Sequence, residues 1–272
     1  MKTRACAKIN LGLNIVKRRP DGYHDLQTVF YPVPIFDDIK IVTDTTLTDV
    51  NLVIEGQPVE GEAEDNLVVK AYRLVAGLYN LPPVEIRLTK RIPMQAGMGG
   101  GSADATFTLR LLNDMFNLQM GTERMTDLAV CLGADCPFFV EARPAYAEGI
   151  GERLTPIELD LSAYKLVIVK PPVAVSTREA FAHVKPVMPE VNCREVVNRP
   201  IEEWRGVLRN DFEESIFPQV PIIGEAKERL YALGAIYAAM SGSGSALFGF
   251  FRKDQVPDLN CTFPCDWFKT VV

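Results

Sequence analysis

A glycine-rich segment in the middle of the chain constrains the fold more than any other feature. Four glycines fall within five positions of the run PMQAGMGGGSADA, which spans residues 93–105. Apolar residues then recur at helical spacing, beginning with Phe107 and Leu111. A glycine-rich turn that opens a helix presents the unpaired N–H groups of the first helical turn, and the helix dipole adds attraction for anions. The pattern predicts a phosphate-binding loop, with Ser102 as helix N-cap and as a ligand for a phosphate-bound metal.

This loop matches neither of two common phosphate-loop motifs. A Walker loop ends in Gly-Lys-Ser/Thr, whereas here Ser102 follows Gly101 directly. A dinucleotide fingerprint counted from Gly97 requires glycine at position 102, which is serine. A flexible loop without a ligand is the alternative on composition alone, although so many glycines are unfavourable for chain entropy.

Composition narrows the class of protein. The length of 272 residues is sufficient for one large domain or two smaller ones. The formal net charge of −6 argues against a broad footprint on a nucleic-acid backbone, so we expect no nucleic-acid partner. No run of residues approaches the length of a membrane span, and the N-terminal residues lack a signal-peptide core. These features favour a cytoplasmic protein without membrane association.

Cysteine and histidine usage gives no indication of a structural metal. The six cysteines form no Cys-x-x-Cys pair, and only two histidines are present, so we expect no zinc site. Reduced thiols fit a cytoplasmic protein, with a redox pair of Cys261 and Cys265 as the alternative.

The first predicted element is a strand over residues 5–16. Apolar residues alternate with polar ones there, which is typical of a half-buried strand. Its outer face carries Lys8, Asn10 and Asn14, a set that suits anions and sugar hydroxyls. An ordinary solvated face is the alternative. Because asparagine is a poor strand former, its presence here favours a ligand-binding role for this face.

A turn at residues 20–22 is followed directly by Tyr23 and His24. An aromatic ring and an imidazole together can stack on and hydrogen-bond a flat heterocycle, although a surface aromatic beside a turn is equally compatible. Further strand is predicted over residues 29–42, broken by Pro32 and Pro34. A short strand is expected at residues 51–54.

The middle of the chain alternates helices and strands around the glycine loop. A helix is expected to start at residues 64–66, with Asn66 or Asp65 as its cap and an apolar stripe of Leu67, Ala71, Leu74, Val75 and Leu78. A strand over residues 84–88 leads into the loop, which gives the strand–loop–helix order that a phosphate site requires.

An acidic residue follows the next predicted helix. Asp135 lies between the helix stop at Gly133 and the apolar run 138–140. A carboxylate held at such a junction can accept a hydroxyl proton or hold magnesium, with a simple turn-forming role as the alternative.

The C-terminal half predicts a second domain that begins near residues 155–161. We expect a hairpin over 146–154, a strand at 164–170, a short helix containing Phe181 that Ser176 or Thr177 caps, and an amphipathic helix that stops at Gly234. Two apolar strands then flank the glycine-rich turn 241–245, and the tail with Trp267 is expected to pack as a closing strand.

Four blocks of this sequence resemble the GHMP kinase superfamily, which includes galactokinase, homoserine kinase and mevalonate kinase. They are AKINLGLNI at 7–15, PMQAGMGGGSADA at 93–105, LGADCPFFV at 132–140 and MSGSGSALFGFF at 240–251. Together they cover the whole length. The most specific part is AKINLGL followed by RPDGYHDLQTVF at 19–30, because other branches lack Gly-Tyr-His there. In these two segments the sequence resembles the branch of the superfamily whose phosphate acceptor is a cytidyl diphosphate sugar alcohol of the non-mevalonate isoprenoid route.

The resemblance implies a two-domain α+β fold. The N-terminal domain, residues 1–157, is expected to resemble ribosomal protein S5 domain 2, and the C-terminal domain, residues 158–272, to be ferredoxin-like, with the active site between them. It also implies an ATP-dependent small-molecule kinase that uses Mg²⁺ and acts as a monomer or homodimer.

Site residues follow from the same resemblance. Lys8 and Asp135 match the active-site pair, with Asp135 as base for the substrate hydroxyl and Lys8 polarising that hydroxyl or keeping Asp135 ionised. Substrate binding is assigned to Tyr23, His24 and Phe181 for the cytosine, and to Asn10 and Thr177 for the sugar and diphosphate. Nucleotide binding is assigned to Asn66, Lys90, Pro93, Met94, Gln95, Ala96, Gly97, Met98, Gly99, Gly100, Gly101, Ser102 and Ala103, with Asn66, Lys90 and Met94 on the base side.

The loop departs from the family pattern at Gln95 and Ala96, where glycine is more frequent, and Ala103 replaces a frequent serine. We expect the loop to bind ATP despite these differences. Two other functions stay open: a homoserine- or mevalonate-type kinase, which would not need Gly22-Tyr23-His24, and a non-catalytic nucleotide-binding protein, which would not need Lys8 with Asp135.

Overall fold

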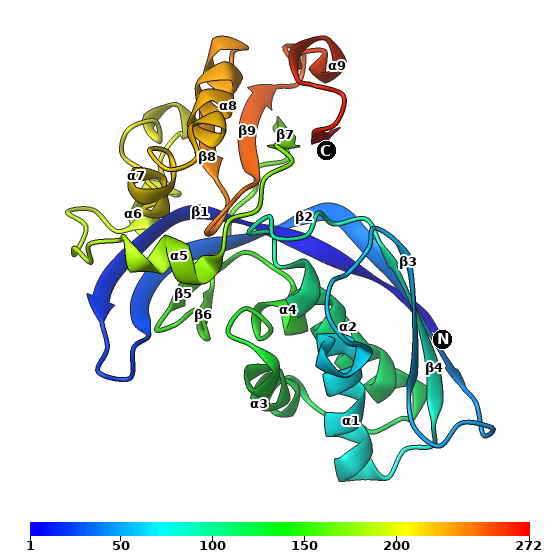
Figure 1. The fold of residues 1–272 in the computed structure, drawn as a ribbon. Coiled ribbons are helices and arrows are strands. Elements are labelled where there is room, and N and C mark those ends of the chain that lie inside the picture. The colour runs from blue at the N-terminus through cyan, green and yellow to red at the C-terminus, as the bar shows by residue number, and fades with distance from the viewer. The chain divides into compact units, whose positions relative to one another are not determined.

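The computed structural model describes residues 1–272, which divide into two compact units. Unit 1 comprises residues 1–8, 32–94 and 99–143, and unit 2 comprises residues 9–31, 95–98 and 144–272. β1 (Lys2–Arg18) and β2 (His24–Thr43) are long strands (Figure 1), and each contributes residues to both units. The loop between β4 (Val84–Lys90) and α2 (Gly100–Met115) is also divided between the units, since its residues 95–98 belong to unit 2 and the rest to unit 1.

β1 is buried on both faces over residues 5–15. Its apolar side chains are fully covered, and the polar side chains of Lys8, Asn10 and Asn14 are buried as well. The prediction of a half-buried strand is therefore wrong. Protein groups take the place of water on the polar face, since Lys8 pairs with Asp135 and the Asn10 side chain donates to Thr28.

β2 continues without a break through Pro32 and Pro34, contrary to the prediction. Residues 28–30 pair antiparallel with β5 (Ala145–Glu148), and residues 38–43 pair antiparallel with β4 (Val84–Lys90). Both prolines lie between these paired segments, so the missing N–H donors leave those two ladders intact.

Unit 1 packs helices beside β4 and its parallel neighbour β3 (Asn51–Gly56), as Figure 1 shows. Its helices are the 3-10 turn η1 (Ala63–Asp65), α1 (Leu67–Tyr79), α2 (Gly100–Met115), α3 (Thr122–Leu132) and α4 (Phe138–Glu141). The predicted cap is confirmed, because Asn66 Oδ1 accepts from the Val68 N–H at 2.9 Å. Of the predicted stripe of α1, Ala71 and Val75 are buried, Leu67 and Leu74 are half-buried, and Leu78 is exposed. Val68, Val69 and Tyr72 are buried as well. The buried Tyr72 donates its hydroxyl to the Pro82 carbonyl oxygen at 2.9 Å.

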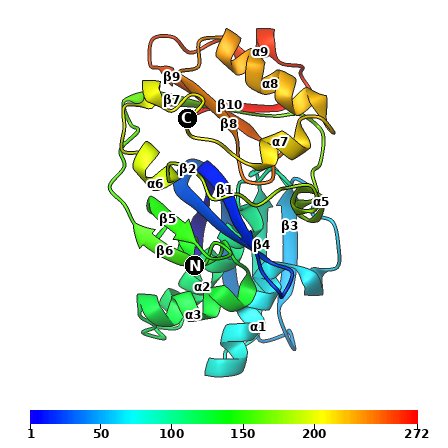
Figure 2. The same cartoon turned by 90° about the vertical axis from the view of Figure 1, so that its left-hand side faces the viewer.

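Unit 2 contains the predicted hairpin of β5 and β6 (Arg153–Pro156) and a four-stranded antiparallel sheet in the order β10–β7–β9–β8. The strands of that sheet are β7 (Tyr164–Lys170), β8 (Tyr237–Met240), β9 (Leu247–Arg252) and β10 (Phe268–Val271). Its helices are α5 (Thr177–Ala182), α6 (Cys193–Val196), the 3-10 turn η2 (Ile201–Glu203), α7 (Phe212–Ile216), α8 (Pro221–Ala232) and α9 (Leu259–Thr262). Figure 2 shows α8 alongside the sheet, where Ile223, Ala226 and Leu230 enter the core. The closing strand at the tail is confirmed, with Trp267 buried beside it.

All six cysteines carry free thiols, including Cys261 and Cys265. None of the helices combines the length and apolar character needed to cross a membrane.

Candidate active site

The predicted phosphate loop connects the end of β4 to the start of α2. The helix begins at Gly100, because Gly99 adopts a left-handed conformation (φ 69°, ψ 19°) as its N-cap. Ala103 donates its N–H to the Gly99 carbonyl oxygen at 2.8 Å, so the N–H groups of the three preceding residues belong to the unpaired first turn. Ser102 is consequently the third residue of the helix, and its prediction as N-cap is wrong. A helix of 16 residues with three such donors suits an anionic group.

Lys8 and Asp135 lie together in unit 1. Lys8 Nζ is 3.4 Å from Asp135 Oδ2, and the side chains are 3% and 34% exposed. Burial lowers the pKa of Lys8, while the charge of Asp135 and a hydrogen bond to it act in the opposite direction. The pair therefore combines a buried amine with a carboxylate that solvent can reach.

Gly99 packs directly against this pair. A Cβ added to Gly99 would lie 2.9 Å from Phe139 Cζ and 3.1 Å from both Cγ and Cε of Lys8. The start of α2 thus lies against the aliphatic stem of Lys8, with no space for a side chain. This contact joins the anion-binding helix terminus to the amine–carboxylate pair within one unit.

The tip of the loop, residues 95–98, packs on the glycine-rich turn 241–245 within unit 2. Ser245 N donates to Gln95 O at 3.1 Å, and Ser241 Oγ donates to Gly97 O at 2.9 Å. A Cβ on Gly97 would overlap the Ser241 carbonyl oxygen, so this close approach requires glycine. Gln95 has φ 49°, a left-handed conformation that residues other than glycine rarely adopt. The second glycine turn therefore supports the loop tip.

Asn10 is connected to the same turn. Its N–H donates to Ser241 Oγ at 3.3 Å, and its Nδ2 donates to Thr28 Oγ1 at 3.0 Å. Thr28 in turn donates to the Gly12 carbonyl oxygen at 2.5 Å. Asn10 is buried, so this network holds its side chain in one orientation.

His24 and Phe181 also lie together in unit 2. Their rings stack with centroids 4.9 Å apart and an interplanar angle of 17°. Burial lowers the pKa of His24, and the charge of Arg18 adds to this effect. A neutral imidazole offers one donor and one acceptor, which is what the Watson–Crick edge of a base requires. Tyr23 is 60% exposed, and Thr177 shares a hydrogen bond of 3.1 Å with Ser243.

Lys90 is enclosed at the end of β4. Its ammonium binds Asp37 Oδ2 and, at 2.6 Å, Asp104 Oδ2, and all three side chains are buried. Sequence reasoning assigned Lys90 to the nucleotide but missed both carboxylates. Asp104 could have been noticed as a charged residue between Ala103 and Ala105 near the start of the predicted helix, whereas nothing near Asp37 marks it as buried.

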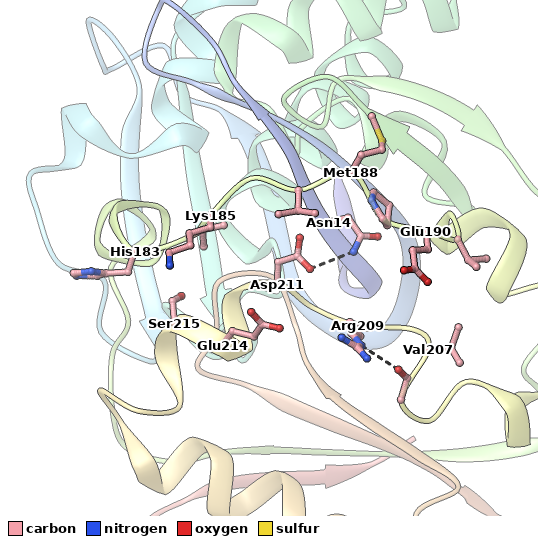
Figure 3. A pocket seen from close by; sticks show the side chains of 15 residues that line it. Asn14, His183, Lys185, Met188, Glu190, Val207, Arg209, Asp211, Glu214 and Ser215 are labelled. Atoms are coloured by element: carbon pink, nitrogen blue, oxygen red, sulfur yellow. Dashed lines mark hydrogen bonds between the residues drawn. The ribbon is translucent and has the colours of Figure 1, made fainter.

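A cavity of about 700 Å³ lies in unit 2 beside α7 (Figure 3). Its lining carries both signs of charge, including Lys185 and Arg209 as well as Asp211 and Glu214. Asp211 accepts from the Asn14 side chain at 3.2 Å and from the Ile15 N–H at 2.7 Å, which fixes β1. None of the five predicted substrate residues contributes to this lining.

Comparison with known proteins agrees with the arrangement of these elements. The family model "GHMP kinases N terminal domain" matches residues 66–142, and "GHMP kinases C terminal" matches residues 194–259. A Bacteroides fragilis protein named 4-diphosphocytidyl-2-C-methyl-D-erythritol kinase is 53% identical over 92% of this chain and 91% of its own. A Porphyromonas gingivalis protein of the same name is 45% identical over 98% of this chain and 97% of its own.

Solved structures give the same result. A crystal structure of 4-(cytidine 5'-diphospho)-2C-methyl-D-erythritol kinase covers 100% of this chain and 98% of its own, with a TM-score of 0.82 and 31% identity. The mevalonate kinase of Methanococcus jannaschii covers 100% of this chain and 97% of its own, with a TM-score of 0.71 at 12% identity, which shows the fold alone. The predicted two-domain α+β fold is thereby confirmed. On its sequence and on its fold, the chain belongs to the GHMP kinase superfamily and, within it, to the family of 4-diphosphocytidyl-2-C-methyl-D-erythritol kinases.

Proposed function

We propose that this ATP-dependent small-molecule kinase phosphorylates the 2-hydroxyl of 4-diphosphocytidyl-2-C-methyl-D-erythritol, a step of non-mevalonate isoprenoid biosynthesis. The observation that carries the proposal is the packing of the α2 N-terminus, through Gly99, on Lys8 and its partner Asp135. A phosphoryl donor and a hydroxyl-activating pair must be neighbours in such a reaction. The names of the relatives supply the acceptor.

Asp135 is the proposed base. Its carboxylate takes the proton of the 2-hydroxyl as that oxygen bonds to the γ-phosphorus, while the bond from phosphorus to the β–γ bridging oxygen breaks and ADP leaves. Lys8 supports this step, because its ammonium, 3.4 Å from Asp135 Oδ2, can polarise the hydroxyl.

The nucleotide phosphates are proposed to bind the loop residues 93–103, with the N–H groups of the first turn of α2 directed at them. Asn66 and Met94 are the proposed contacts on the base side. Mg²⁺ would neutralise charge on the phosphates, and it commonly needs only one or two protein oxygens. The Ser102 hydroxyl, in the first turn of α2, fits that need and would hold the ion.

The cytidyl end of the acceptor is proposed to bind His24, Phe181 and Tyr23, and its sugar and diphosphate to bind Asn10 and Thr177. The stacked pair of His24 and Phe181 supports this assignment, since it already presents an aromatic surface and a polar edge. We further propose that the family domains correspond to residues 1–157 and 158–272, and that the enzyme works in the cytoplasm as a monomer or homodimer. The matched ranges 66–142 and 194–259 lie on either side of that boundary.

The experiment is phosphate transfer from Mg-ATP to 4-diphosphocytidyl-2-C-methyl-D-erythritol, with homoserine, mevalonate and galactose in parallel. Transfer to the cytidyl compound alone is the expected result. Transfer to a different acceptor would leave the phosphate loop in place and refute the cytosine assignment. ATP binding without transfer to any acceptor would refute catalysis and favour a nucleotide-binding protein.

A further inference from the structure

Three buried charged residues join the two ends of the phosphate loop. Lys90 is the last residue of β4, and Asp104 lies at the start of α2, just after its first turn. Their side chains meet at 2.6 Å and are 2% and 3% exposed. The ion pair therefore closes the segment between them, which contains the entire glycine-rich run.

Asp37 completes the cluster from β2. One of its oxygens binds the Lys90 ammonium, and the other accepts the N–H groups of Arg91 at 2.5 Å and Ile92 at 2.8 Å. Asp37 thus fixes both the side chain of Lys90 and the backbone of the two residues that enter the loop. Buried charges with so many partners keep one geometry, because any displacement leaves a charge unpaired.

Asp104 is less well satisfied than Asp37. Its Oδ1 is buried and has no hydrogen-bond partner, and burial, with Asp37 nearby, raises its pKa to about 7. A buried carboxylate with an unpartnered oxygen is unfavourable for stability, so its presence in the helix that forms the phosphate site needs an explanation beyond packing. Gly100, the first residue of α2, lies directly over the cluster, since a Cβ there would be 3.4 Å from Lys90 Nζ.

We propose that Asp37, Lys90 and Asp104 act as positioning residues that set the distance between the end of β4 and the first turn of α2, and so fix the loop that binds the nucleotide phosphates. This inference rests on the proposed use of ATP. It gives Lys90 a role through the loop instead of contact with the nucleotide base. The backbone of Lys90 is engaged as well, because its carbonyl oxygen accepts the Gln57 N–H at 3.1 Å.

The test compares Asp104→Ala with Asp104→Asn, which retains an oxygen to accept from Lys90. The matched control is Asp38→Ala on β2, the strand that carries Asp37. It removes an exposed carboxylate, which pairs with Arg91 at 2.6 Å. For each variant we would measure the Kd of Mg-ATP by calorimetry, the Ki of inorganic tripolyphosphate against ATP, and the KM of the acceptor.

We expect Asp104→Ala to weaken Mg-ATP and tripolyphosphate by the same factor, about tenfold, because both bind through phosphates. The acceptor KM should change less than about twofold, and Asp104→Asn and Asp38→Ala should stay within about threefold of the wild type. A loss for ATP without a loss for tripolyphosphate would show a base contact and overturn the proposal. Lower thermal stability with unchanged affinities would also overturn it.

If Asp104→Ala does not fold, Asp37→Asn takes its place. Its amide oxygen can still accept the N–H groups of Arg91 and Ile92, but its amide nitrogen cannot accept from the Lys90 ammonium. We expect Asp37→Asn to weaken Mg-ATP and tripolyphosphate by the same factor, and unchanged affinities in the folded variant would refute the proposal. Mg-ATP binding by the wild type without transfer to any acceptor would refute the proposed function while leaving these comparisons valid.

Discussion

Replacing Gly99 by alanine tests whether the start of α2 is fitted against the amine–carboxylate pair. The new Cβ would lie 2.9 Å from Phe139 Cζ and 3.1 Å from Lys8 Cε, and the residue would keep a left-handed φ of 69°. The left-handed conformation costs roughly 1–2 kcal/mol for a residue with a Cβ. Crowding in a packed site adds about 1–3 kcal/mol. We therefore expect a loss of about 3 kcal/mol in the free energy of unfolding.

Gly101→Ala is the matched control. Its Cβ would meet only Leu67 Cδ1 at 3.9 Å, and its φ is not left-handed, so alanine should raise stability by about 0.4–1 kcal/mol. Thermal unfolding followed by circular dichroism measures both. Gly99→Ala should lower Tm by about 6–12 °C, whereas Gly101→Ala should not lower it.

Turnover gives a second readout for Gly99→Ala. Because one of the two crowded side chains is Lys8, we expect kcat to fall at least about tenfold in the fraction that stays folded. A Gly99→Ala protein with the Tm and kcat of the wild type would refute the fit between the helix start and Lys8.

Three further predictions follow from the geometry. Asp135→Asn should reduce kcat by about 10²–10⁴-fold and leave the Kd of ATP nearly unchanged, and unchanged turnover would remove Asp135 from the mechanism. Phe181→Ala should raise the KM of the cytidyl acceptor about tenfold without raising the KM of ATP, which steady-state kinetics with each substrate varied would show. Asp104 has a folded pKa raised to about 7 from 3.8, so it binds more protons folded than unfolded, and its contribution to stability should be lost as pH rises through about 7. Urea unfolding at several pH values should show this decline in the wild type and not in Asp104→Asn.

The order of elements around the phosphate loop could be predicted from sequence because its signals are local. Glycine density marks the loop, period-two alternation marks β4, and Asn66 marks the start of α1 two residues before the N–H that it accepts. The start of α2 was misplaced because a serine is a strong cap by composition, whereas the left-handed conformation of Gly99 depends on the packing beneath it. Local patterns identify such a helix but not the residue at which it begins.

Burial of polar residues was the main feature that the sequence left undetermined. Alternation in β1 separates two faces but does not show whether the polar face meets water or protein. Asp37 is 53 positions from Lys90, and no local pattern connects them. Local chemistry suggested Lys8 and Asp135 separately, and only the resemblance to a family paired them. The structure supplies a physical reason for the pair through their distance and through Gly99.

The two buried lysines of unit 1 show why partners matter more than residue type. Lys90 lies between two fully buried carboxylates, and their charges raise its pKa despite burial, so its ammonium is held for structure. Lys8 pairs with Asp135, a carboxylate that is one-third exposed, and burial lowers the pKa of Lys8. A buried lysine with a lowered pKa, beside a carboxylate open to solvent, is suited to an incoming anion or a polarised hydroxyl. The same residue type on two strands of one unit thus favours loop positioning at Lys90 and chemistry at Lys8, a difference set by which carboxylates the fold places beside each.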